Sequence, residues 1–335
     1  MVNLGLARLG DVLFVIAAVG YSAAMIAFTA EYAFGRRARQ RQSPATRIPV
    51  LVSTAGTRDF EPGTVRLDTG PVLDDQGPLP GAAGRSGVRL LIVGALIHAA
   101  SIVIRGVAVD RVPWGNMYEF SSVVALMAVL AFLAVLLRIP VVRYLGGFIL
   151  LPVLLVMFLT GTVLYTRASQ LVPALQSYWL AIHVSAAATS EGVLMTSALM
   201  TGLYLLRVRY DRSVEADHPV RFPVAVGERL PAAQTLDKAA FRIVVFAFPL
   251  YTFGIIAGAI WAEAAWGRYW GWDPKETWAF IAWVIYAGYL HARATGGWKG
   301  NRAALINLLG FAAMTFNFFV VNMVISGLHS YAGLN

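Results

Sequence analysis

The sequence predicts an all-α, polytopic membrane protein with about eight transmembrane helices and both termini on the extracytoplasmic side. Hydrophobic residues make up 58% of the 335-residue chain and charged residues 13%, whereas soluble domains carry roughly 25% charged residues. The hydrophobic residues gather in about eight runs of roughly 20 residues, the length that crosses a bilayer as a helix. Of the 27 lysines and arginines, 21 lie in segments on one side of these runs, which marks that side as cytoplasmic.

The first transmembrane helix is expected within residues 1–35. No small-residue cleavage site follows it cleanly, so we interpret it as a retained span and not as a signal peptide. The basic run from Arg36 to Arg41 places its far end in the cytoplasm. Residues 36–87 are rich in Pro and Gly and contain no long apolar run, so they are expected to form a flexible cytoplasmic linker.

Residues 88–335 are expected to form a membrane domain of seven helices. The predicted spans are approximately 88–109, 120–137, 144–164, 182–206, 241–261, 277–294 and 303–327. Because successive loops alternate between the two sides of the membrane, the loop at 266–278 is predicted to be external.

The external loop 266–278 reads WGRYWGWDPKETW and is the most distinctive stretch of the chain. Trp and Tyr commonly anchor proteins at membrane interfaces, and that is one interpretation of this loop. Four tryptophans interleaved with Gly267 and Gly271 also form an apolar platform that a planar ligand could approach. Asp273 and Glu276 flank Pro274 at the start of the next span, where they are suited to cap a helix.

The five histidines are the candidate metal ligands. His183 and His329 are predicted at external ends of spans, on the side of the tryptophan-rich loop, and imidazole is the usual protein ligand of haem iron. His291 lies fifteen residues after Glu276, or about 22 Å farther along the helix, too far to reach the same ligand. A hydrogen bond to a neighbour is the alternative role for each of them.

The remaining histidines and the external arginines are less informative. His98, inside the second span, either helps to hold a ligand within the membrane or pairs with a neighbouring helix. His218 is expected to be a solvated loop residue. The arginines nearest the external loops, Arg105, Arg111 and Arg268, could pair with ligand carboxylates or extend to the interface.

The loop 266–278 resembles the tryptophan-rich WWD signature of the haem-handling family that includes CcsA, CcmC and CcmF. WLAIHV around His183 and GLHSYA around His329 resemble the segments that carry the two external histidines of that family. PWGNMYE at 113–119 resembles a further CcsA-type segment, and the chain length fits the CcsA type.

The resemblance implies a set of haem-contacting residues. It implies that His183 and His329 ligate the iron of haem b at an external site, and that His291 ligates haem iron within the membrane. Haem b is then a substrate and ligand. The contacts implied in the signature are Trp266, Trp270, Trp272, Asp273 and Trp278.

The function implied is that of a system II cytochrome c synthase subunit in the plasma membrane. Such a protein delivers haem across the membrane and presents it on the extracytoplasmic side for attachment to the CxxCH motif of apocytochrome c. Its implied partners are a ResB/CcsB-type membrane subunit, apocytochrome c and membrane lipid. The chain contains no Cys, so the thiols must come from the substrate. No nucleic-acid-binding motif is present. The alternatives are a transporter of haem or another amphipathic solute without synthase activity, and a structural subunit anchored by its tryptophans.

Overall fold

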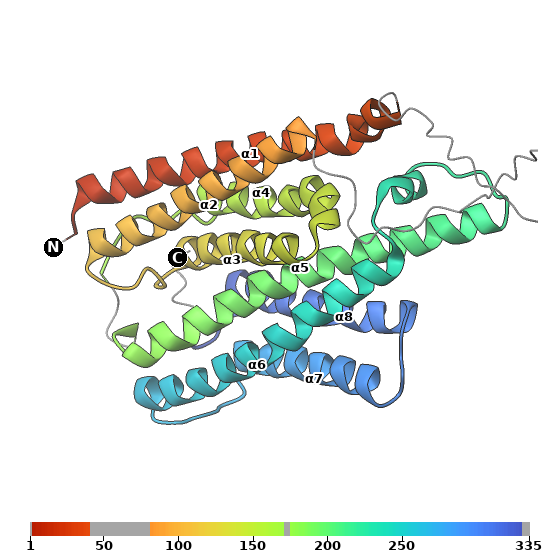
Figure 1. Cartoon of the computed structure of the whole chain (residues 1–335). Coiled ribbons are helices and arrows are strands. Elements are labelled where there is room, and N and C mark those ends of the chain that lie inside the picture. The colour runs from red at the N-terminus through yellow and green to blue at the C-terminus, as the bar shows by residue number, and fades with distance from the viewer. Residues whose placement is uncertain (1, 41–80, 171–174, 330–335) are drawn as a thin grey trace, which may run out of the picture.

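The structure, a computed structural model, describes residues 2–40, 81–170 and 175–329 (Figure 1). The described residues contain helices and no strand, which confirms the predicted all-α class. The α-helices are α1 (Leu4–Gln40), α2 (Ala82–Val109), α3 (Met117–Arg138), α4 (Gly146–Thr162), α5 (Tyr178–Glu215), α6 (Ala233–Trp266), α7 (Pro274–Ala294) and α8 (Asn301–Phe316). Shorter helical turns are η1 (Pro140–Leu145), η3 (Val224–Arg229) and the π-helical η4 (Asn317–Val321).

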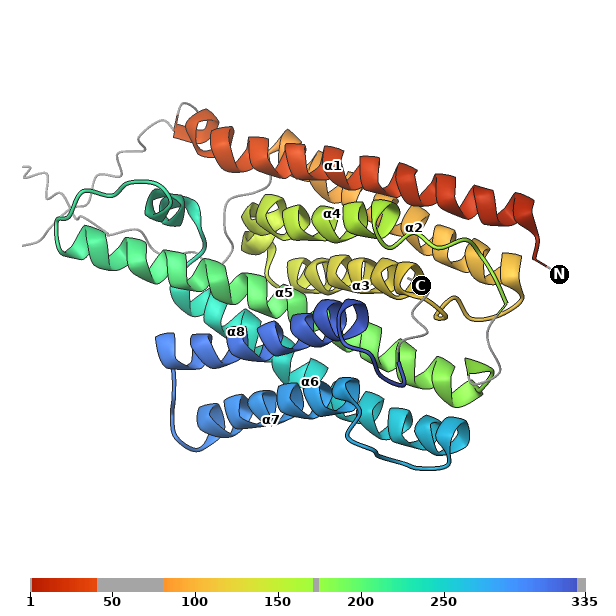
Figure 2. The same cartoon turned by 180° about the vertical axis from the view of Figure 1, so that it is seen from behind.

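Six of the helices are long and apolar enough to cross a membrane: α1, α2, α3, α4 with η1, α6, and α8 with η4. This supports a polytopic membrane protein, as predicted. The other two, α5 and α7, run alongside them but carry more polar residues (Figures 1 and 2). The prediction that they also span the membrane therefore depends on their place in the bundle and not on their hydropathy.

The helices pack in layers (Figures 1 and 2). Helix α1 lies along α2, the pair α3 and α4 separates α1 from α5, and α5 lies along α6. Helix α8 packs against α5, and α7 packs against α8 and α6. Helices α5, α6, α7 and α8 therefore enclose a shared space at one end of the bundle.

The predicted linker boundaries differ from the helix ends in the structure. Helix α1 continues to Gln40 and α2 begins at Ala82, so both helices extend into the segment 36–87. Residues 41–80, on which the prediction of a flexible linker mainly falls, lie outside the described residues.

His98 belongs to the packing of α1, α2 and α3. Its ring is fully buried, with Nδ1 3.3 Å from the Tyr21 hydroxyl and Nε2 3.0 Å from Ser122 Oγ. Gly94 permits the close approach of α1, because a Cβ there would lie 2.8 Å from the Tyr21 ring. Both ring nitrogens of His98 are thus engaged, which favours the helix-pairing role over ligand binding.

The first and last described segments lie at the same end of the bundle. Asn3 donates its backbone N–H to Ala108 O at the end of α2 (2.8 Å), and His329 contacts Asp273 at the start of α7. We call this end, which carries residues 267–273, the loop end. The described α-helices are even in number and alternate in direction, so the first and the last described segments lie at the same end of the bundle. Which side of the membrane the loop end faces stays a prediction.

Candidate functional site

A pocket opens at the loop end between α5, α6, α7 and α8. It contains about 1270 Å³ of empty space, counting the part that is open to solvent. Both His183 and His329 line it, and so do the aromatic residues Trp114, Trp261, Trp266, Tyr269 and Trp270. A concave, mainly apolar pocket with a few polar groups is typical of a ligand site.

His183 is held from one side of its ring. It lies in the second turn of α5, and its Nδ1 is 2.8 Å from Gly254 O on α6. Since the carbonyl only accepts, Nδ1 must carry the proton, and Nε2 is then the nitrogen with a lone pair. Gly258 provides the space, because a Cβ there would lie 2.7 Å from the His183 ring. His183 is therefore oriented as a metal-binding histidine usually is.

His329 is held in the same manner by Asp273. Its Nδ1 lies 2.8 Å from Asp273 Oδ2, and the other carboxylate oxygen accepts the Leu328 N–H at 2.8 Å. Asp273 is also the N-cap of α7, in a capping box with Glu276. The carboxylate thus has two tasks, since it caps the helix and orients the imidazole.

The charges of this pair suit an imidazole ligand. Burial opposes ionisation of Asp273, but hydrogen bonds from His329 and the Leu328 N–H outweigh it and lower its pKa to about 2. Burial lowers the pKa of His329, although the hydrogen bond to Asp273 acts in the opposite direction. At neutral pH the carboxylate is consequently charged and the imidazole neutral, which is the form that binds a metal.

Trp261 connects the two histidines. Its ring is stacked on His183, with centroids 6.0 Å apart and planes 12° apart, and it meets His329 edge to face at 5.8 Å. Trp266 contacts both Trp261 (4.8 Å) and His329 (5.1 Å). The two candidate ligands therefore lie in one aromatic cluster, although 146 positions separate them in the sequence.

The four tryptophans of the loop 266–278 have different positions. Trp266 and Trp270 line the pocket. Trp272 has a φ of +57°, unusual for a bulky residue, and its side chain is 66% exposed outside the pocket. Trp278 packs against Phe316 of α8 with centroids 4.1 Å apart. The structure thus brings two of the four predicted tryptophan contacts to the pocket.

Sequence reasoning missed several pocket residues. Trp261, Glu191 and Lys275 line the cavity but were not among the predicted site residues. Glu191 interrupts a predicted span, and an ionisable group inside a span is by default a functional candidate. That signal could have identified Glu191. Trp261 ends a predicted span, and nothing in its local sequence distinguishes it from an interfacial anchor.

His291 and His218 lie away from the pocket. His291 is exposed in the last turn of α7, at the opposite end of that helix from Asp273. His218 is exposed in the segment between α5 and α6. The structure therefore does not bring His291 together with His183 and His329, in agreement with the length of α7.

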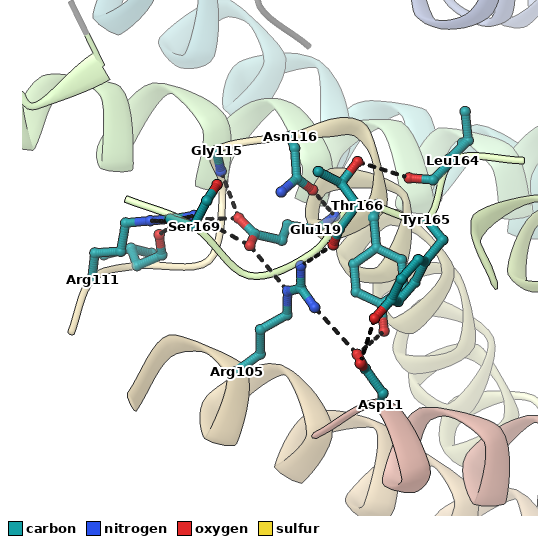
Figure 3. A network of polar contacts seen from close by, with 12 residues as sticks. Asp11, Arg105, Arg111, Gly115, Asn116, Glu119, Leu164, Tyr165, Thr166 and Ser169 are labelled. Carbon is teal, nitrogen blue, oxygen red and sulfur yellow. Dashed lines mark hydrogen bonds and ion pairs between the residues drawn. The ribbon is translucent and has the colours of Figure 1, made fainter. Parts of the chain in front are cut away.

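A buried ionic network holds the loop that carries Trp114 (Figure 3). Glu119, in the first turn of α3, accepts from Arg105 Nε (3.0 Å), Arg111 Nη1 (2.9 Å) and the Gly115 N–H (2.8 Å). Arg105 also pairs with Asp11 of α1 at 3.2 Å. Arg105 and Arg111 are thus engaged by carboxylates of the chain itself. Neither these two arginines nor Arg268 lines the pocket.

If His329 ligates haem iron, as the sequence resemblance implies, we expect Asp273→Asn to weaken haem binding about 10- to 100-fold, the usual effect of losing a partner behind a metal-binding histidine. The amide can still accept from Nδ1 but without charge. Titration of haem into the purified protein, followed by absorption, measures the change. Asp110→Asn is the control, because Asp110 is exposed at the same end of the bundle. Equal affinities for wild type and Asp273→Asn would contradict this role.

Comparison with known proteins identifies a family that matches the part of the chain that carries the pocket. Residues 114–329 match the family described as cytochrome C assembly protein. The match begins at Trp114 and ends at His329, which both line the pocket. The cytochrome c biogenesis protein CcsA of Guillardia theta is 40% identical over 235 residues, covering 67% of this chain and 77% of that protein.

Two further relatives carry the same description. CcsA of Trieres chinensis is 37% identical over 255 residues, covering 69% of this chain and 81% of that protein. CcsA of Synechococcus elongatus is 38% identical over 199 residues, covering 49% of this chain and 61% of that protein.

Proposed function

The chain belongs to the cytochrome c assembly family and is of its CcsA type, and from this premise we propose that it binds haem b in the pocket for attachment to apocytochrome c. Its role lies in cytochrome c biogenesis. Haem is the substrate, and its iron is ligated by His183 and His329. The pocket opens on the extracytoplasmic side of the plasma membrane, where apocytochrome c arrives.

One observation carries this proposal. Two histidines line a single aromatic pocket, and each has its Nδ1 directed at a fixed acceptor, Gly254 O or the Asp273 carboxylate. Histidines that ligate metals almost always use the second ring nitrogen in this way. Among the described residues, no group of three His, Asp or Glu side chains could hold a bare metal ion. Haem iron does not need such a group, because the porphyrin ring supplies its other four ligands.

The chemistry follows from haem and from the composition of the chain. The tryptophan rings of the pocket pack against the faces and edges of the porphyrin. Two imidazoles saturate the iron and limit its reactions until the substrate is bound. The CxxCH thiols then add to the vinyl groups to form thioethers. The chain contributes no Cys, so its part is to bind and orient haem.

The proposed partner is a ResB/CcsB-type membrane subunit. His291 is exposed on α7, so a haem bound there would lie on the surface of this chain, within the membrane. A second protein would have to cover that haem. We therefore propose that haem enters from the cytoplasmic side, passes His291 at the subunit interface and moves to the pocket.

The proposal is tested with the full-length protein purified in detergent. We expect bound haem with the absorption spectrum of six-coordinate, low-spin iron. With the partner subunit and an apocytochrome added in membranes, covalent holocytochrome should form. Haem binding without attachment would favour the transporter alternative. A purified, folded protein that binds no haem would contradict the proposal.

We expect His291→Ala to lower the amount of haem that reaches the pocket in cells, because the relay ligand is lost while the pocket is unchanged. The measurement is haem per protein after purification, compared with the affinity for haem added in vitro. The first should fall and the second should not. Normal haem content and normal cytochrome output would reduce His291 to a surface residue.

A further inference from the structure

The pocket is lined by polar residues as well as by aromatic ones. Glu191 of α5, Lys275 of α7, Asn317 of η4 and Asn322 just after it all line the cavity. Lys275 Nζ lies 2.5 Å from Asn322 Oδ1 and interacts electrostatically with Glu191. We call these four residues the polar wall. The aromatic cluster of Trp261, Trp266 and His329 lines the same pocket.

The polar wall extends from the loop end, where Lys275 lies in the first turn of α7. Glu191 follows His183 by eight positions on α5, which places it about 12 Å farther along the helix axis. Asn317 precedes Asn322 by five positions, and its buried Oδ1 has no hydrogen-bond partner among the described residues. The polar wall therefore runs from Lys275 at the loop end to Glu191 farther along the bundle, and neither side chain is among the described hydrogen-bond partners of the two histidines.

Lys275 is the one lysine or arginine among the described residues that line this pocket. Its hydrogen bond to Asn322 uses one of three ammonium donors, so two remain for a ligand. The outer arginines Arg105 and Arg111 are already held by Glu119. An anionic group inside the pocket would consequently find its positive partner at Lys275.

Haem is an amphipathic disc with chemically different edges. Its two propionates lie on one edge and its two vinyl groups on the opposite edge. A carboxylate is stabilised by an ammonium in a poorly solvated pocket, whereas apolar vinyl groups suit aromatic surroundings.

We propose that Lys275 binds a propionate of haem and thereby sets the orientation of the ring in the pocket. This inference rests on the haem binding proposed above. Glu191 is a competing carboxylate, because it interacts electrostatically with the same ammonium, as Asp273 also does. A propionate that pairs with Lys275 replaces Glu191 as the neighbouring anion.

The experiment combines a change in the ligand with a change in the protein. Haem and haem dimethyl ester, in which both propionates are esterified, are titrated into the full-length protein in detergent. We expect the wild type to bind haem roughly 10- to 100-fold more tightly than the ester, the range for a hydrogen bond between charged groups. Lys275→Met should lose that preference, while the low-spin spectrum from His183 and His329 remains.

Three further variants sharpen the test. Lys275→Arg keeps the charge and should retain the preference. Glu191→Gln removes one competing anion and should increase the preference. Lys299→Met is the control, because Lys299 is exposed in the segment between α7 and α8.

The outcomes separate the two proposals. If the wild type gives a low-spin spectrum with both ligands and binds them equally, the orientation by Lys275 is wrong while haem binding stands. The same conclusion follows if Lys275→Met keeps the wild-type preference. If neither ligand gives a low-spin spectrum with the wild type, it is the proposed haem binding that fails.

Discussion

Replacing either His183 or His329 with alanine is expected to convert the bound haem from six-coordinate, low-spin iron to five-coordinate iron. In the proposed bis-histidine site each imidazole occupies one axial position, so the loss of either one opens that position. We expect haem affinity to fall by more than the roughly 10- to 100-fold that follows loss of a partner behind the ligand. Absorption spectra and haem titration of the purified variants measure both effects.

Added imidazole provides the positive control for these variants. It is small enough to enter the space left by the missing ring, and it should restore part of the low-spin spectrum. His218→Ala is the matched control, because His218 is exposed and lies away from the pocket. The bis-histidine proposal would be wrong if either variant kept a six-coordinate spectrum without imidazole, or if His218→Ala had the same effect.

Glu119→Ala is expected to cost about 3–5 kcal/mol of folding free energy, the range for removing one partner of a buried ion pair. The Glu119 side chain is fully buried and is paired with both Arg105 and Arg111. Its loss leaves two guanidinium groups without their carboxylate and releases the Gly115 N–H (Figure 3). Thermal or denaturant unfolding in detergent measures the effect.

Glu119→Ala should alter the wall of the pocket as well as lower the stability of the fold. The segment from Gly115 to Glu119 holds Trp114 at the wall of the pocket, so haem binding should weaken as well. Glu263→Ala is the control, because Glu263 is exposed near the loop end of α6. If Glu119→Ala unfolded like the wild type and bound haem normally, the network would have no role in shaping the site.

Much of the candidate site could be predicted from the chain. The histidines at 183 and 329 and the tryptophan-rich loop each lie next to the end of a predicted span. Alternation of spans alone places them at one end of the bundle. Asp273 could be recognised as a helix cap because Pro274 and Glu276 follow it. Its second task, orienting His329, requires a contact across 56 positions that no local pattern encodes.

The sequence by itself determined the all-α membrane class and the approximate helices, because the length and hydropathy of a span depend on consecutive residues. Only the tertiary structure decided which side chains of the helices pack against other helices and which face the pocket. It assigned His98 to helix packing and turned Trp272 outward. It also brought Glu191, Trp261 and Lys275 into one pocket. The reason is that the rotation of each helix about its axis is set by its neighbours, and this rotation decides which side chains face the shared space.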